Sequence, residues 1–267
     1  MPDVTYTHGH HESVLRSHRW RTAENSAGYL LDHLRPRMSL LDVGCGPGTI
    51  TCDLADRLAP GAVVGIDASE PVIAEARALA VTSGRSGVSF EVGNLFDLPF
   101  EDASMDVVHA HQVLQHVGEP VAALVEMARV CRPGGIVAAR DGDYPAMSFF
   151  PTDAELDRAL DAYGALTRVN GANWDAGRRL LHWAQRVGFT SVVASASTWC
   201  FATPEERAWW GGLWADRFTQ SSLADQLLGS GIADRADLGS FAAAWRRWAA
   251  SPDGWFAVLH GEVLCTV

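Results

Sequence analysis

Apolar residues in the first half of the chain repeat with two alternating periods. Between residues 22 and 34, alanine and leucine recur at the spacing of one helical face, and Arg35-Pro36 ends this pattern. Short, nearly continuous apolar runs separated by helical patterns follow, at 39–44, 62–67, 88–93, 105–111 and 134–140. Apolar strands that alternate with helices predict an α/β fold whose parallel sheet is covered on both faces, with a ligand crevice at the carboxyl ends of its strands.

The second half of the chain has a different composition, because nine of the ten tryptophans lie at or beyond Trp174. A helix at 178–186 and a strand at 191–199 continue the alternation. Two amphipathic patterns, at 204–218 and 237–250, predict helices inserted as a cap.

The chain shows no internal repeat and no low-complexity linker, and 267 residues with 48% hydrophobic content suffice for one large core. We therefore predict a single domain over residues 1–267. It begins with an N-terminal lid segment (1–21) and a ligand-binding core (22–143). The remaining core helix and strand follow together with the helical cap (144–255), and a final strand lies at the sheet edge (256–267).

Charge and cysteine content exclude several classes of protein. A formal net charge of −11 argues against docking on nucleic acid, because neutralising phosphates requires clustered Lys and Arg. The five cysteines include no CxxC pair, so we expect neither a disulfide framework nor a metal site. No signal-peptide core and no membrane-length apolar run occurs. We expect a cytoplasmic protein without membrane insertion, with a homodimer as an open alternative to a monomer.

The first candidate for chemistry is the segment LDVGCGPGT, at 41–49. Asp42 ends the first predicted strand, and Gly44, Gly46 and Gly48 form the turn into the next helix. Glycine is needed where a ligand approaches the backbone closely or where φ is positive. A nicotinamide or flavin site instead favours G-x-G-x-x-G. Because Thr49 stands in the place of the third glycine, we disfavour that interpretation.

Further motifs follow in order: GIDAS, GNLFDLPF, DVVHAHQVLQHV and RVCRPGG. Together with the glycine turn, they resemble the class I S-adenosylmethionine (SAM)-dependent methyltransferases, in particular the ubiquinone and menaquinone biosynthesis type that methylates small molecules. The similarity covers about residues 40–140. It implies a Rossmann-like, doubly wound, mostly parallel seven-stranded sheet, and methyl transfer from SAM with S-adenosylhomocysteine as product.

The resemblance assigns cofactor contacts residue by residue. Gly44 and Gly46 would line the methionine and ribose end of SAM. Asp67 would accept hydrogen bonds from both ribose hydroxyls, a role that suits an acceptor-only carboxylate. Ala68 would lie against the adenine.

Three further cofactor contacts are expected. Asn94 and Leu95 stand where the family places an acidic residue and a small residue at the adenine amino edge, so Asn94 departs from the commonest pattern. Gln112 would reach the methionine portion. From the N-terminal segment, Arg19 is our candidate partner for the SAM carboxylate, because Arg binds carboxylates bidentately.

Catalysis of methyl transfer mainly requires alignment, and a base is needed only where the acceptor loses a proton. Our candidates are His11 in a histidine-rich lid segment, His111 at the end of a strand, and Asp143 in the turn after the 134–140 strand.

The acceptor pocket is expected beneath the Trp-rich cap, with Tyr144, Trp209 and Trp245 as candidate lining residues. This predicts a small, largely apolar small-molecule acceptor, with O- and C-methylation favoured over N-methylation. The alternative is a SAM-binding protein without transferase activity, such as a sensor or partner subunit.

Overall fold

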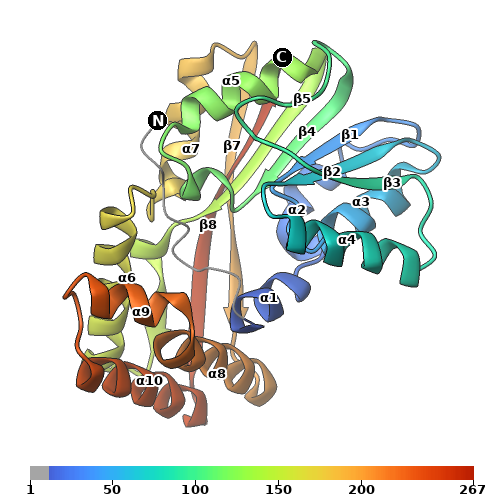
Figure 1. The fold of residues 1–267 in the computed structure, drawn as a ribbon. Helices are drawn as coiled ribbons and strands as arrows, with labels where there is room; N and C mark the ends of the chain where they lie inside the picture. The colour runs from blue at the N-terminus through green and yellow to red at the C-terminus, as the bar shows by residue number, and fades with distance from the viewer. Residues whose placement is uncertain (1–11) are drawn as a thin grey trace.

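The computed structural model describes residues 12–267, in which eight strands form one sheet flanked by helices (Figure 1). The strands are β1 (Leu40–Val43), β2 (Val63–Asp67), β3 (Val88–Val92), β4 (Met105–His111), β5 (Cys131–Gly142), β6 (Ser148–Phe150), β7 (Ser191–Phe201) and β8 (Trp255–Thr266). The helices are α1 (Glu12–Arg19), α2 (Ala23–Leu31), α3 (Thr49–Leu58), α4 (Glu70–Thr82), α5 (Pro120–Val130), α6 (Ala154–Val169), α7 (Ala176–Val187), α8 (Pro204–Gln220), α9 (Ser222–Gly229) and α10 (Arg235–Ala250).

Five strands are parallel, in the order β3-β2-β1-β4-β5, which confirms the predicted doubly wound sheet. The prediction that the last strand lies at the sheet edge is wrong. β8 pairs antiparallel with β5 and β6 on one side and with all of β7 on the other. β7 therefore lies at the edge of the sheet opposite β3, and β8 is internal because both of its edges are hydrogen-bonded. The short β6 is the strand that the expected count of seven left out.

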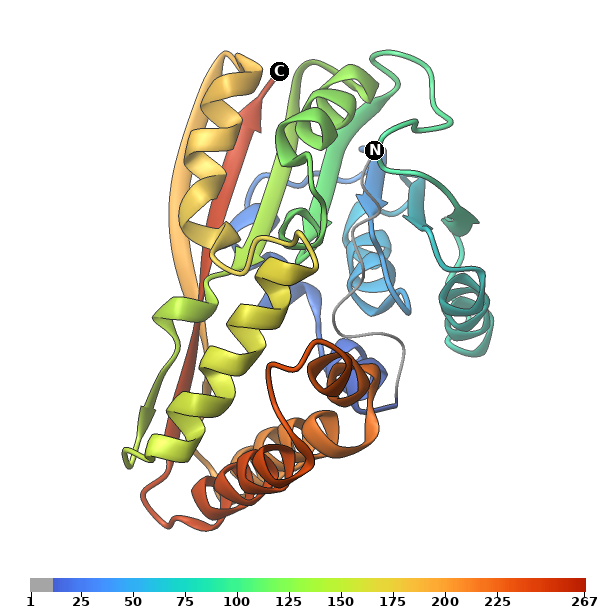
Figure 2. The same ribbon diagram turned by 60° about the vertical axis from the view of Figure 1, so that its left-hand side comes forward.

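Helices cover both faces of the sheet (Figure 2). On one face, α2 and α3 pack on inward residues such as Leu40 and Val107. On the other face, α5 and α7 pack on the alternate residues, such as Leu41 and Val108. The alternation follows from the two-residue period of strands, and it leaves the carboxyl ends of the strands open to a ligand.

Beyond those ends, the long strands β7 and β8 run down to the helical cap (Figure 1). The cap contains α6, α8, α9 and α10, two helices more than the sequence predicted. Its core is a continuous aromatic cluster that includes Trp210, Trp214, Trp245 and Phe256. The cap shares β7 and β8 with the sheet, so it is an extension of the same fold.

The segment between α1 and α2 is fixed by local sequence. Thr22 begins α2 with a capping box, in which its hydroxyl accepts the Asn25 N–H and the Asn25 side chain accepts the Thr22 N–H. This cap fixes the position of the preceding residue, Arg21. Within residues 12–267, none of the helices is both long and apolar enough to cross a membrane.

Candidate active site

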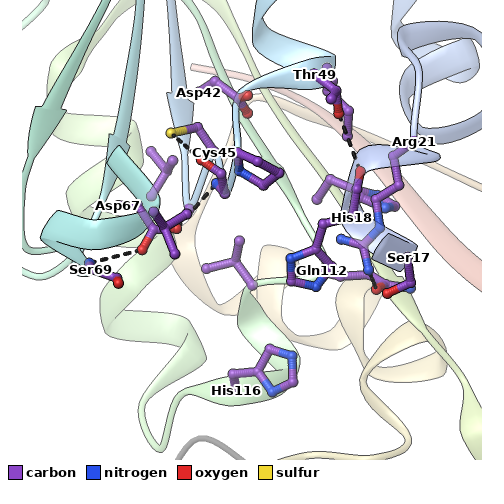
Figure 3. A pocket seen from close by; sticks show the side chains of 18 of the residues that line it. Ser17, His18, Arg21, Asp42, Cys45, Thr49, Asp67, Ser69, Gln112 and His116 are labelled. Atoms are coloured by element: carbon purple, nitrogen blue, oxygen red, sulfur yellow. Dashed lines mark hydrogen bonds between the residues drawn. The ribbon is translucent and has the colours of Figure 1, made fainter. Parts of the chain in front are cut away.

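A cavity of about 880 Å³ lies between the carboxyl ends of the strands and the cap. The turns after β1, β2 and β4 line one end, with glycines and small or polar side chains. Side chains from α8, β7 and the segment after α1 line the other end, which is mostly aromatic. Figure 3 shows the polar side chains that converge on this space.

The glycine turn gives the cavity its backbone wall. Gly44 has a φ of +66°, and a Cβ at this position would collide with the Val113 side chain. Gly48 has a φ of +82°, and its Cβ would lie 2.7 Å from the Phe90 ring. Both positions therefore require glycine for conformation and for space, whereas a Cβ on Gly46 would have no heavy atom closer than 3.8 Å.

Asp67 lies at the end of β2 with both carboxylate oxygens oriented by the backbone (Figure 3). Its Oδ2 accepts the Gly46 N–H at 3.1 Å, and its Oδ1 accepts the Ser69 N–H at 3.0 Å. A carboxylate has about four acceptor sites, so each oxygen keeps one for a ligand. Two adjacent acceptors in fixed positions match a vicinal diol.

Gln112 follows β4 with a φ of 54°, which is uncommon for a residue other than glycine. Its Oε1 accepts from Arg21 Nη2 at 2.6 Å, and its Nε2 lies 2.8 Å from His260 Nε2. The other ring nitrogen of His260 lies 3.1 Å from the Val258 carbonyl and must donate to it. Nε2 of His260 therefore accepts from the amide, which assigns both the histidine tautomer and the orientation of Gln112.

Helix α1 is held against both the core and the cap. The Thr49 hydroxyl donates to the His18 carbonyl at 3.3 Å, and Arg217 on α8 donates to the Ser17 hydroxyl at 2.8 Å. Ser17 and His18 both line the cavity (Figure 3). α1 thus covers the junction between the glycine turn and the aromatic end.

The aromatic end is lined by Trp20, Trp199, Trp209, Trp210, Trp214, Tyr144 and Met147. The Trp199 ring is edge-on to Trp20 at a centroid distance of 5.3 Å. The indole N–H of Trp199 donates to the Asn25 carbonyl at 2.7 Å, and the guanidinium groups of Arg21 and Arg140 lie over the ring at 5.6 and 5.1 Å. These contacts hold Trp199 in a fixed orientation.

His111 joins the two ends of the cavity. It is the last residue of β4, it lines the cavity, and it is only 5% exposed. Neither ring nitrogen has a hydrogen-bond partner among the described residues. Burial, together with nearby Arg21 and Arg140, holds the pKa of His111 well below its usual range. The imidazole is therefore neutral near pH 7.

Ten of the residues predicted from the sequence line this single cavity. They are Gly44, Gly46, Asp67, Ala68, Asn94, Leu95, His111, Gln112, Tyr144 and Trp209. The Asn94 side-chain oxygen also accepts the Phe96 N–H at 3.0 Å, so this residue shapes its own turn as well.

Three predicted site residues lie elsewhere. Arg19 is not a lining residue, and its guanidinium forms an ion pair with Glu75 on α4 at 3.0 Å. Asp143 is buried away from the cavity, where Arg178 donates to both of its carboxylate oxygens at 2.6 Å.

Trp245 is the third correction. It is fully buried inside the cap, where its ring stacks on Trp214 at 5.3 Å and lines no part of the cavity. Helical spacing identified an inward face but did not distinguish the cap core from the cavity wall. The remaining candidate, His11, lies outside the described residues.

Arg21 and Trp199 also line the cavity, although neither was predicted from the sequence as a site residue. Arg21 lies two positions after the chosen Arg19, in the turn between α1 and α2, and it lines the cavity whereas Arg19 does not. Trp199 was predicted only as part of a strand. Its position near the end of β7, where the strand leaves the covered part of the sheet, was the available signal.

The chain is similar in sequence to known methyltransferases. Residues 34–191 match the family model of a methyltransferase domain. An uncharacterized methyltransferase of Schizosaccharomyces pombe is 34% identical over 267 residues, covering 97% of this chain and 95% of that protein. A demethylmenaquinone methyltransferase of Lactococcus lactis is 34% identical over 120 residues, covering 45% of this chain and 48% of that protein.

Among solved structures, phosphoethanolamine N-methyltransferase 2 of Haemonchus contortus, in complex with S-adenosylhomocysteine, superposes with a TM-score of 0.55. The identity is 15%, and the match covers 87% of this chain and 50% of that one, so this likeness concerns the fold.

Proposed function

This chain belongs to the SAM-dependent methyltransferase family, and from that premise we propose that it methylates a small, largely apolar acceptor at oxygen or carbon. The observation that carries the proposal is the composition of the cavity. One end has the polar and glycine groups that a nucleoside and an amino acid require, and the other end is aromatic.

The residues present fit SAM. Asp67 offers two free acceptor positions for the ribose hydroxyls, and the exclusion of side chains at Gly44 leaves the backbone open to a ligand. Ala68, Asn94 and Leu95 line the adjoining wall, as an adenine requires. When bound, SAM supplies a methyl group already activated on a sulfonium.

Arg21 is the residue we assign to the SAM carboxylate, in place of Arg19. Its guanidinium lines the cavity and is oriented by the Gln112 side chain and by the Trp199 ring. A guanidinium held in this way can bind a carboxylate without further ordering of its side chain. Gln112 then acts in the site chiefly by positioning Arg21.

The acceptor is assigned to the aromatic end. Apolar side chains there exclude water from the space next to the glycine turn, and exclusion of water strengthens electrostatic interactions at the reacting groups. The cap and α1 together enclose this space, so a folded protein or a nucleic acid duplex would not fit within about 880 Å³ shared with a cofactor.

The test is a screen of purified protein with SAM and a panel of acceptors, read by mass spectrometry as the gain of one methyl group. Turnover of planar aromatic or lipid-like hydroxyl and carbon acceptors is expected. Turnover restricted to peptides, RNA or polar amines would refute the proposal. Tight S-adenosylhomocysteine binding with no turnover on any acceptor would favour a sensor or partner subunit instead.

A further inference from the structure

We propose that the acceptor is a phenol-type aromatic hydroxyl compound and that His111 is the base that receives its proton. This inference deepens the proposed function and rests on it, because it takes the aromatic end of the cavity as the acceptor site. It narrows the reaction to O-methylation and gives a catalytic role to a residue on β4.

The first argument is hydrogen bonding. Two other buried histidines already have partners, since His109 bonds Asp42 at 2.7 Å and His260 bonds Gln112 at 2.8 Å. Half-buried His116, which also lines the cavity, bonds Gln115 at 3.0 Å. Both ring nitrogens of His111 lack a partner within residues 12–267, although the side chain is buried. An unsatisfied buried polar group is costly, so a ligand group that bonds it restores a large part of that free energy.

The second argument is position. His111 lies next to Gln112, the residue that borders the cofactor end, and its ring centroid is 5.7 Å from that of Trp199. A hydroxyl bonded to His111 would thus lie where the two ends of the cavity meet. The aromatic ring that carries the hydroxyl would lie among Trp20, Trp199 and Trp209. Aromatic pairs prefer such offset or edge-on contacts.

The third argument is charge. Besides burial, the groups that lower the pKa of His111 most are Arg21 before α2, Arg140 on β5, His260 on β8 and His109 on β4. All of them, together with burial, favour the neutral imidazole, which has one nitrogen free to accept a proton.

The step balances in atoms and charge. The acceptor O–H bond breaks and its proton passes to a ring nitrogen of His111, while an oxygen lone pair forms the new C–O bond and the C–S bond electrons pass to sulfur. One positive charge is lost at the sulfonium and one appears on the imidazolium. The total charge of the enclosed site is unchanged, which makes a proton acceptor inside a buried cavity feasible. The imidazolium then releases its proton to water after the product leaves.

The test compares binding of two isosteric probes, 2-naphthol and 2-methylnaphthalene, to the protein with S-adenosylhomocysteine present, measured by quenching of the cavity tryptophans. We expect wild type to prefer the naphthol by about tenfold, the value of one hydrogen bond to a buried group. His111→Phe should abolish that preference and leave the affinity for 2-methylnaphthalene unchanged. His116→Phe is the matched control: His116 also lines the cavity, but its ring is already bonded to Gln115, so this variant should keep the preference.

The outcomes distinguish the role of His111 from the apolar acceptor site on which it rests. Binding of both probes without a hydroxyl preference, or a preference that survives His111→Phe, overturns the role of His111 while the apolar acceptor site stands. Failure of wild type to bind either probe overturns the proposed acceptor site itself. Unchanged S-adenosylhomocysteine affinity and melting temperature in His111→Phe verify that the variant is folded.

A kinetic measurement completes the test once an acceptor is found by screening. His111→Phe should lower kcat by at least about a hundredfold, as expected for loss of a positioned base, and the loss should shrink as pH approaches the pKa of the acceptor hydroxyl. A loss of the same size at every pH would indicate a structural role and overturn the assignment.

Discussion

Asp67 provides the sharpest test of the cofactor site. Two of its about four acceptor positions are used by backbone N–H groups, which leaves two for the ribose diol. A hydrogen bond to a charged group contributes about 1.5–3 kcal/mol. Asp67→Ala should therefore weaken S-adenosylhomocysteine binding by at least about tenfold, with an upper limit of about 6 kcal/mol if both bonds are lost without replacement by water.

Titration calorimetry with S-adenosylhomocysteine measures this loss directly. Asp97→Asn is the matched control, because Asp97 is an exposed carboxylate nearby that does not line the cavity, and its affinity should stay within about twofold of wild type. The 2′-deoxy analogue should bind wild type more weakly, and Asp67→Ala should bind it almost as well as the parent ligand. Equal affinity of folded Asp67→Ala and wild type for S-adenosylhomocysteine would refute the diol assignment.

Three other predictions concern residues whose positions the structure decided. Arg21→Ala should weaken the binding of S-adenosylhomocysteine by about tenfold or more, but it should not change the binding of 5′-methylthioadenosine, which lacks the amino acid. Arg19→Ala should change the affinity for neither ligand in titration calorimetry. Trp245→Ala should lower the free energy of unfolding by about 3–5 kcal/mol in urea titrations, because Trp245 is fully buried in the cap core. The folded variant should keep its affinity for S-adenosylhomocysteine, and a loss of affinity without a loss of stability would contradict this position. Burial raises the pKa of Asp141 to about 7, above its value of about 4 in an unfolded chain. Its contribution to stability is therefore present below about pH 4 and is lost as pH rises through about 7. Relative to wild type, Asp141→Asn should gain stability over that window, by up to about 4 kcal/mol, and a difference that does not vary with pH would refute the assignment.

The cofactor end was largely predictable because its determinants are local. The glycine turn begins directly after β1, Asp67 is the last residue of β2, and Gln112 directly follows β4. Parallel strands bring their carboxyl ends to the same edge of the sheet. Once the strands were identified from their apolar runs, the convergence of these residues followed from the period of the elements and the direction of the strands. The same argument correctly placed His111 at the cavity.

The acceptor end depended on tertiary structure. Trp209 and Trp245 both lie on amphipathic cap helices, and their sequence spacing did not distinguish which of them lines the cavity. Only the packing of α8 against α10 placed Trp245 in the cap core. Asp143 was expected at the crevice because it follows β5, but its carboxylate is bonded by Arg178 from α7 and does not line the cavity.

The sequence by itself determined an α/β sheet with a SAM site at the carboxyl ends of its strands. Strand period, turn chemistry and motif order each depend on residues that are close together in the chain. The tertiary structure decided which arginine lines the cavity, that β8 lies inside the sheet, and which aromatic rings lie near His111. These features join residues such as Arg21, His111 and Trp199, which are far apart in the chain. Their contacts depend on how a capped turn, a strand end and an edge strand pack together, and no local pattern of hydrophobicity specifies that packing.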